Sequence, residues 1–386
     1  MKTVAVLGGG PAGSVAAARL AQGGVKAILI DEKLAWEKPC GGGVTCKAYK
    51  EYPFLIENDT PKKLVRNSCL SEPSAGSATL EMSQPLLIYA RKDLNGMLLE
   101  RAAKQGADIV KSRVTAAERA SDGGWNITTK QGNIHADSCI VALGARNPLR
   151  NMGAEWRDGD TMTALGYFVD SDRDHVDIRF LQGFEGYIWV FPRLGHLSVG
   201  ICGKGESAQA MRARLERYMD EEGIPYKDAR FYGHMLPSLE QSSWRSHRVA
   251  GDGWLAVGDS AGLVDPVTGE GIYYAVRSGD VAATSLLEHG TIESEAAYRD
   301  QLKREFIDDL TYGAHLSKRL FCESIFGASM TSRMIQLMRR SPLLTQVVED
   351  LFAGSQNYLT LKKRLLETAS GLFPDMMLRT FFPSKV

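Results

Sequence analysis

A glycine-rich turn near the start of the chain has the residue types and the spacing that bind a dinucleotide. Residues 8–13 read Gly-Gly-Gly-Pro-Ala-Gly, which is a GxGxxG pattern. Its first glycine permits a tight turn, its second lets the backbone approach a pyrophosphate, and its last allows a helix to pack closely on a strand. The helix that follows would hold phosphates at its N-terminus. The alternative is a purely structural turn. The cofactor contacts expected here are Gly8, Gly10, Pro11, Ala12 and Gly13.

An acidic side chain stands where such a fold needs one for a ribose. Asp31 ends the apolar run 25–30, about 20 residues after the turn. A carboxylate at this point accepts hydrogen bonds from ribose hydroxyls and repels a 2′-phosphate. Asp31 therefore favours FAD or NAD over NADP.

A second glycine-rich segment, residues 254–272, combines an aspartate with a Gly-Glu-Gly turn before a helix. Asp259 could hold polyol hydroxyls. The backbone at Gly269, Gly271 and Ile272 could approach a ring closely. The positive end of the helix would stabilise negative charge that develops on a reduced flavin. The segment alone could be an ordinary loop, but together with the first turn it predicts FAD rather than NAD.

Cys40 is the first candidate for acid chemistry. It precedes three glycines, residues 41–43, whose backbone could lie flat against a flavin or bend sharply. An ordinary thiol is protonated near neutral pH, so Cys40 could donate a proton or shape the pocket. The alternative is a small buried apolar side chain. We expect the glycines, Gly42 among them, to form the pocket wall rather than to take part in catalysis.

Three aromatic residues alternate along one predicted strand. Tyr187, Trp189 and Phe191 fall on the same face, because alternate residues of a strand share a face. They would form a flat apolar wall, with Trp189 and Phe191 at the substrate and the phenol of Tyr187 as a second proton donor. The alternative is an ordinary core contact, since aromatic residues favour strands.

The elements that must position these residues can be predicted from their periodicity. Residues 3–7, 11–24 and 25–30 predict a strand, a helix and a second strand, which together form a βαβ unit. Further buried strands are expected at 138–143 and 254–259, period-2 strands at 160–202, and mostly helices after about residue 294.

Composition limits the function classes. The chain has 386 residues with 46 basic and 46 acidic side chains, so nothing favours binding to nucleic acid. Its six cysteines lack CxxC spacing and its histidines lack metal-ligand spacing, so we expect free thiols and no metal. The N-terminus does not resemble a signal peptide and no apolar run is long enough to span a membrane. We therefore expect a cytoplasmic protein, with peripheral attachment to a membrane left open.

The motifs at 8–13, 38–43 (KPCGGG), 187–192 (YIWVFP) and 258–272 occur together and in order. In this the chain resembles the FAD-dependent geranylgeranyl reductase family, within the p-hydroxybenzoate hydroxylase-like flavoproteins. The resemblance implies that Asp31, Arg91 and Asp259 contact FAD.

Two positions depart from that pattern. Leu143 replaces the aspartate of a GADG motif associated with FAD and pyridine-nucleotide binding, so the electron donor is left open between NAD(P)H and another reductant or redox partner. Cys202 replaces the second glycine of a GxG pattern that begins at Gly200, which could alter the pocket wall.

These observations predict an α/β fold with α+β elements. It consists of a discontinuous Rossmann-like FAD domain, an inserted mixed β-sheet that binds substrate, and a helical C-terminal region. The expected boundaries are 1–70, 90–155 and 245–290 for the FAD domain, 71–89 and 156–244 for the substrate sheet, and 291–386 for the helical region.

The leading hypothesis is reduction of carbon–carbon double bonds in an isoprenoid or similar apolar substrate, such as a prenyl lipid or a quinone side chain. One rival is an FAD-dependent monooxygenase on an aromatic or apolar molecule; another is a non-catalytic electron carrier. A halogenase fits less well, because that branch has Trp-x-Trp-x-Ile-Pro where this chain has YIWVFP. The apolar stretch 371–382 could line a substrate tunnel, touch a membrane, or simply pack on the core.

Overall fold

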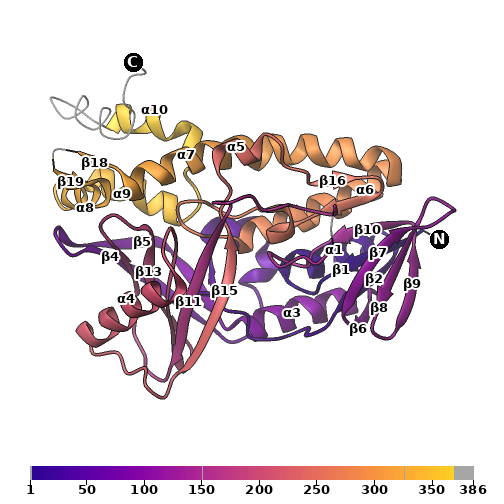
Figure 1. The fold of residues 1–386 in the computed structure, drawn as a ribbon, viewed down its shortest axis with the longest axis horizontal. Helices are drawn as coiled ribbons and strands as arrows, with labels where there is room; N and C mark the ends of the chain where they lie inside the picture. The colour runs from indigo at the N-terminus through magenta and orange to yellow at the C-terminus, as the bar shows by residue number, and fades with distance from the viewer. Residues whose placement is uncertain (1, 150, 326, 369–386) are drawn as a thin grey trace.

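The first residues fold as their periodicity predicts. The apolar strand β1 (Thr3–Leu7) leads through the glycine turn into α1 (Pro11–Gln22), and β2 (Lys26–Asp31) returns parallel to β1. The computed structural model describes residues 2–149, 151–325 and 327–368. Figure 1 shows this N-terminal unit at one end of the molecule and the C-terminal helices at the other.

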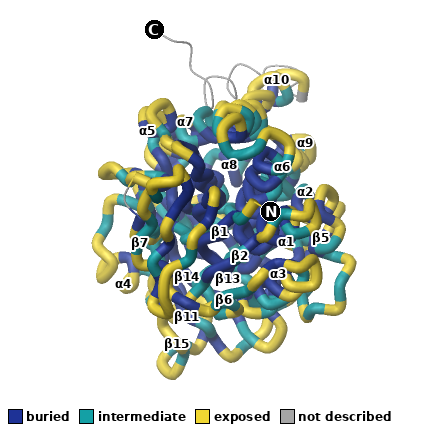
Figure 2. The backbone as a smooth tube through the Cα atoms, turned by 90° about the vertical axis from the view of Figure 1, so that its right-hand side faces the viewer, coloured by how far each residue is buried: buried dark blue, intermediate teal, exposed yellow. Residues whose placement is uncertain are grey.

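A six-stranded sheet contains this unit. Its order is β16-β17-β10-β1-β2-β6, and it is parallel except for β16. The added strands are β6 (Asp108–Lys111), β10 (Ser138–Val141), β16 (Ala250–Gly251) and β17 (Trp254–Ala256). Every residue of β10 and β17 is buried, as expected for strands covered on both faces. Figure 2 shows these central strands in the buried interior.

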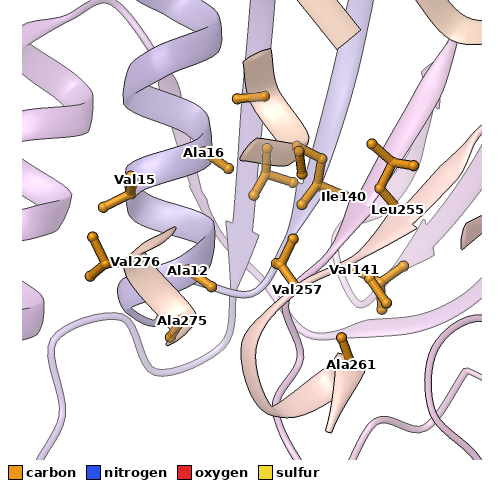
Figure 3. Close-up of a cluster of buried hydrophobic side chains, with 14 of the residues drawn as sticks. Ala12, Val15, Ala16, Ile140, Val141, Leu255, Val257, Ala261, Ala275 and Val276 are labelled. Carbon is orange, nitrogen blue, oxygen red and sulfur yellow. The ribbon is translucent and has the colours of Figure 1, made fainter. Parts of the chain in front are cut away.

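Close packing of two helices brings the two glycine motifs together. The long helix α6 (Ile272–Leu302) starts directly after the second motif and lies against α1 through small side chains (Figure 3). Contact is so close that a Cβ on Gly279 would stand 2.2 Å from the carbonyl oxygen of Ala12. The two motifs, far apart in the sequence, therefore share one edge of the sheet.

A mixed eight-stranded sheet stands beside the first. Its order is β15-β11-β14-β13-β12-β4-β5-β3, and all neighbours are antiparallel except β12 and β4. Its strands are β3 (Gly43–Val44), β4 (Lys62–Glu72), β5 (Gly76–Tyr89), β11 (Thr161–Val169), β12 (Val176–Phe180), β13 (Glu185–Arg193), β14 (His196–Lys204) and β15 (Arg230–Pro237). The helix α4 (Ala208–Glu221) packs its apolar side on one face of this sheet.

The remaining elements surround these sheets. Near the six-stranded sheet lie β7 (Val114–Arg119), β8 (Trp125–Thr129) and β9 (Gly132–Ala136), which form a small sheet of their own. The short helices are α2 (Cys46–Glu51), η1 (Pro53–Leu55), α5 (Gln241–Trp244) and η2 (Gly258–Ala261), and α3 (Arg91–Lys104) is longer. After α6 come η3 (Lys303–Ile307), α7 (Asp308–Cys322), β18 (Ser324–Ile325), β19 (Ala328–Ser329), α8 (Met330–Met338), α9 (Pro342–Phe352) and α10 (Tyr358–Thr368). Of these, α8 and α9 pack on β4 and β5.

The predicted fold class is confirmed, and one strand crosses an expected boundary. The eight-stranded sheet takes in residues before 71, because β4 starts at Lys62 and pairs with β5 along its length. The helix α6 extends from Ile272 to Leu302, and its backbone leaves helical geometry at Gly290, next to the expected boundary at 290. The division into discontinuous domains stays our proposal. The stretch 371–382 lies outside the described residues. Within the described part of the chain, no helix is both long enough and apolar enough to cross a membrane.

Candidate functional site

One cavity of about 570 Å³ collects most of the residues predicted from the sequence. Both sheets and the C-terminal helices contribute to its wall. The predicted residues that line it are Gly10, Pro11, Ala12, Asp31, Cys40, Gly42, Arg91, Tyr187, Trp189, Phe191, Asp259, Gly269, Gly271 and Ile272. Gly8 and Gly13 do not line it.

The glycines of the first turn differ in what surrounds them. Gly8 has a φ of +112°, and a Cβ there would stand 2.2 Å from the carbonyl oxygen of Ala142. A Cβ on Gly13 would stand 1.9 Å from the carbonyl oxygen of Gly8. Gly10, in contrast, faces open space, with no atom within 4 Å of such a Cβ. Gly8 and Gly13 thus allow backbone segments to pack closely within the turn, and Gly10 leaves room for a ligand at the start of α1.

Asp31 holds this turn in place. Its carboxylate accepts hydrogen bonds from the backbone N–H groups of Gly9 at 2.8 Å, Lys33 at 2.7 Å and Leu34 at 2.5 Å. The side chain is partly exposed at the cavity wall, where the predicted ribose would lie. The structure therefore adds a structural role to the one expected for Asp31.

Arg91 presents a buried cation to the cavity. It is the first residue of α3 and only 4% exposed. One terminal nitrogen donates to Asn95 Oδ1 at 3.3 Å, while its Nε has no hydrogen-bond partner among the described residues. A buried guanidinium nitrogen without a partner is costly, so the site suits an anionic or oxygen-rich ligand.

Asp259 forms an ion pair that the sequence did not reveal. The Nζ of Lys38 lies 2.7 Å from Oδ2 of Asp259. Burial raises the pKa of Asp259, but the ammonium of Lys38 outweighs burial and the pKa is lowered overall. Lys38 belongs to the KPCGGG motif, so that motif was the available signal. The pair keeps a carboxylate ionised at the predicted flavin site.

The second glycine motif forms a loop before α6. Gly269 has a φ of +69°, and α6 begins after Gly271 without a side-chain cap. The first N–H groups of a helix have no partner within the helix, and here a neighbouring acid takes up part of them. Glu270 accepts a hydrogen bond from the N–H of Tyr273 at 2.7 Å, and burial raises its pKa to about 7. This acid was also missed by the sequence reasoning.

A buried ion pair positions Cys40. The side chain of Arg193 is fully buried, pairs with Glu37, and donates to the carbonyl oxygen of Cys40. Ser198 Oγ donates to the same carbonyl at 3.0 Å, and the Cys40 Sγ accepts from the N–H of Gly42 at 3.3 Å. The backbone around Cys40 is thus held from β13 and β14, with its thiol at the cavity wall.

The three glycines after Cys40 have structural roles. A Cβ on Gly41 would stand 2.9 Å from the ring of Phe191, and one on Gly43 would stand 3.1 Å from it. Gly42 has a φ of +86°, and a Cβ there would stand 2.1 Å from the carbonyl oxygen of Tyr89. Phe191 therefore packs against the glycine segment while it also lines the cavity.

Tyr187 and Cys202 face each other across β13 and β14 at the cavity wall. The phenol donates to the carbonyl oxygen of Thr268 in the second glycine motif. Burial raises the pKa of Tyr187 well above its usual range and raises that of Cys202 to about 12. Both groups therefore carry their protons at neutral pH. The replacement of glycine by cysteine at 202 does change the wall, because it adds a second thiol beside Tyr187.

His234 extends the same row of residues. It lies opposite Ala164, which lies opposite Cys202, and all three line the cavity. Its Nε2 is buried and has no hydrogen-bond partner in the described part of the chain. Burial, together with the positive charge of Lys38, lowers the pKa of His234 to about 3, so the ring is neutral. The sequence analysis found no metal-ligand spacing among the histidines and did not single out His234, which only the order of the strands brings to the cavity.

The far end of the cavity is apolar. Its wall there consists of side chains from α7, α8 and α9: Leu320, Met334, Val348, Leu351 and Phe352. A smaller cavity of about 70 Å³ shares four of these residues and continues to Tyr358, Leu361 and Leu365 of α10. An elongated apolar molecule therefore fits between the sheet and the C-terminal helices.

The polar end fits a flavin dinucleotide. The open space at Gly10 and the unpartnered Nε of Arg91 are features that such a cofactor would use. Cys40 and Tyr187 line the same cavity, where a protonated group could serve a bound substrate. Leu143 also lines the cavity, where the related pattern has an aspartate. Within the described residues, no cluster of three His, Cys, Asp or Glu side chains could hold a metal ion.

Comparisons with known proteins agree with this geometry. Residues 2–161 match a family model described as pyridine nucleotide-disulphide oxidoreductase. The chain is 30% identical over 316 residues to the chloroplastic geranylgeranyl diphosphate reductase of Arabidopsis thaliana, which covers 74% of this chain and 65% of that protein. It is 28% identical over 325 residues to digeranylgeranylglycerophospholipid reductase 2 of Methanothermobacter thermautotrophicus, covering 78% of this chain and 82% of that protein.

A solved structure shares the whole architecture. The geranylgeranyl bacteriochlorophyll reductase-like protein of Thermoplasma acidophilum superposes with a TM-score of 0.76 at 23% identity, covering 96% of this chain and 100% of that one. The present chain spans about two thirds of the length of the Arabidopsis relative. The predicted resemblance is confirmed: this chain is similar in sequence to geranylgeranyl reductases, and it shares the fold of a geranylgeranyl bacteriochlorophyll reductase-like protein.

Proposed function

We propose that this protein is an FAD-dependent oxidoreductase that reduces carbon–carbon double bonds of an isoprenoid or similar apolar substrate. The observation that carries the proposal is the lining of the cavity of about 570 Å³. One end has the glycine turns, Arg91 and the Lys38–Asp259 pair of a dinucleotide site, and the other end is apolar and reaches the C-terminal helices. The relatives are named as reductases of prenyl compounds, which agrees with an elongated apolar substrate.

The residues of this chain have distinct tasks in that reaction. FAD held by the glycine turns, Arg91 and the Lys38–Asp259 pair would, once reduced, supply the hydride for the double bond. Cys40 and Tyr187 are the candidates to hold the proton that the second carbon receives. Trp189 and Phe191 form the wall against which the chain of the substrate lies. The apolar side chains of α7 to α9 keep water away from it.

Anaerobic mixing tests the proposal. The enzyme, reduced with dithionite under argon, is mixed with prenyl diphosphates, prenyl-ether lipids and prenylquinones, and flavin absorbance is followed. We expect one of these classes to reoxidise the flavin and to yield a product two hydrogens heavier per reduced bond. A long-lived flavin hydroperoxide on addition of oxygen, with oxygen-dependent product, would instead establish the monooxygenase reading.

The electron donor is proposed to be NAD(P)H or another reductant. Leu143 at the cavity wall removes a carboxylate that the related pattern places there, so binding of a pyridine nucleotide has one fewer polar partner. Stopped-flow reduction of the bound flavin by NADPH, NADH and dithionite ranks the donors. Flavin that dithionite reduces but neither nucleotide reduces points to a protein redox partner.

We also propose peripheral contact with an anionic membrane through one face of α10. Leu359 and Leu366 are 55% and 41% exposed, and Lys362 and Lys363 lie between them at helical spacing on the same face. Exposed leucines with lysines suit the interface of an anionic bilayer. In vesicle flotation, we expect Leu359→Gln/Leu366→Gln to lose binding to vesicles that contain phosphatidylglycerol. Ile292→Gln, which changes an exposed residue of α6, is the control. If the unmodified protein, the double leucine variant and Ile292→Gln all float with the vesicles to the same extent, the contact is disproved.

A further inference from the structure

Asp265 organises the loop that precedes α6. Its Oδ1 accepts hydrogen bonds from the N–H groups of Val267 at 2.9 Å and Thr268 at 2.8 Å. Its own N–H donates to the carbonyl oxygen of Glu270, and the N–H of Gly269 donates back to the carbonyl oxygen of Asp265, at 2.8 and 2.9 Å. The carboxyl is only 9% exposed. The shape of this loop therefore depends on one buried acid.

The C-terminal helix α10 supplies the partner of this acid. Tyr358, its first residue, donates its hydroxyl to Asp265, with oxygen–oxygen distances of 2.8 and 2.9 Å to the two carboxylate oxygens. Tyr358 is 4% exposed. Its ring fits because residue 313 of α7 is glycine: a Cβ on Gly313 would stand 2.7 Å from the ring. Ser317 of α7 also donates to the carbonyl oxygen of Pro266 at 2.7 Å.

The other side of the loop carries a candidate proton donor. The carbonyl oxygen of Thr268 accepts the hydrogen bond of Tyr187, and a Cβ on Gly269 would stand 2.7 Å from the Tyr187 hydroxyl. A shift of the loop would therefore move this hydroxyl as well as the glycine backbone at the start of α6.

We infer that Tyr358 and Asp265 are positioning residues, through which α10 holds the flavin-binding loop and Tyr187 in their working places. The expected effect of these residues on turnover rests on the proposed function. Their effect on flavin binding can be tested directly, without a substrate. It assigns to the C-terminal region a task besides enclosing substrate: the helix that closes the apolar end also sets the geometry of the polar end.

Substitution of Tyr358 by phenylalanine tests this coupling. The Tyr358→Phe variant keeps the ring and removes the hydroxyl, so the fold should persist while the loop loosens. We expect the FAD dissociation constant to rise about tenfold, as the loss of one hydrogen bond to a charged group implies. We also expect an altered visible flavin spectrum. Gly313→Ala, which displaces the ring but keeps the hydroxyl, should act in the same direction. Tyr218→Phe, a buried tyrosine of α4 on the opposite face of the sheet, should change neither readout.

A double-mutant cycle separates positioning from general loss of structure. Tyr358→Phe and Asp265→Ala should each weaken FAD binding, and adding Tyr358→Phe to Asp265→Ala should weaken it no further, because the acceptor of the hydroxyl is already gone. Fully additive effects, or a Tyr358→Phe variant with parental FAD affinity and spectrum, would overturn the inference. These readouts need no substrate, so the failure of every prenyl compound to reoxidise the flavin would count against the proposed function and not against this inference.

Discussion

The indole of Trp189 lies directly over Gly200 of the neighbouring strand. A Cβ on Gly200 would stand 2.2 Å from Cζ2 of that ring, and the two residues are paired across β13 and β14. The aromatic wall of the cavity therefore depends on a glycine in the next strand. The same relation recurs between β11 and β15. A Cβ on Gly166 would stand 2.4 Å from the hydroxyl oxygen of its paired residue Tyr232.

Alanine at position 200 should disturb the cavity without direct contact with the cofactor. Gly200→Ala forces the indole off the sheet, and overpacking of this kind costs about 1–3 kcal/mol of unfolding free energy. Urea denaturation of the holoenzyme measures the loss. Gly233→Ala on β15 is the matched control, since the nearest atom to its new Cβ would be Cδ2 of Leu165 on β11, at 3.5 Å. Equal stability of the two variants would contradict the packing described here.

Removal of the Cys40 thiol should separate binding from chemistry. We expect Cys40→Ala to keep FAD but to lose turnover about a hundredfold, the lower range for loss of a general acid. Single-turnover flavin reoxidation measures the chemical step, and Tyr187→Phe in the same assay shows which group carries the proton. The control is Cys322→Ala, which changes an exposed thiol. Unchanged turnover in Cys40→Ala would leave Cys40 with a packing role only.

Loss of the Asp259 carboxylate should release flavin. Asp259→Ala leaves the ammonium of Lys38 without its partner at the cofactor end of the cavity, and we expect the FAD dissociation constant to rise about tenfold or more. Flavin retained after ultrafiltration gives the measurement. Asp172→Ala removes an exposed partner of a lysine and should have no effect. Parental flavin retention in Asp259→Ala would exclude a cofactor contact at this residue.

Glu270 should make stability depend on pH. Burial raises its pKa to about 7, above the value of an unfolded glutamate. Between these two values the folded state keeps a proton that the unfolded state has released, so the stabilising effect is complete at low pH and is lost as pH rises toward 7. From pH 5 to pH 8, the Glu270→Gln variant should therefore gain about 1–2 kcal/mol relative to the parent, after allowance for partial exposure. Chemical denaturation at both pH values measures this, with the exposed Glu100→Gln as control; a pH-independent difference would show that Glu270 titrates normally.

The sequence alone determined the features that depend on neighbouring residues. The glycine turn, the βαβ unit, the acid at the end of β2 and the shared face of Tyr187, Trp189 and Phe191 follow from turn chemistry and from periods of 3.6 and 2 residues. Those patterns also predicted FAD and the fold class, because a few residues in a row suffice to specify them.

Only the tertiary structure decided which distant residues meet. The pairs Lys38 with Asp259, Glu37 with Arg193, and Asp265 with Tyr358 join residues from different parts of the chain. His234 reaches the cavity because of the order and register of β11, β14 and β15, and a shift of one residue would turn it to the opposite face. Such contacts are set by the packing of whole elements, and local patterns carry no record of that packing.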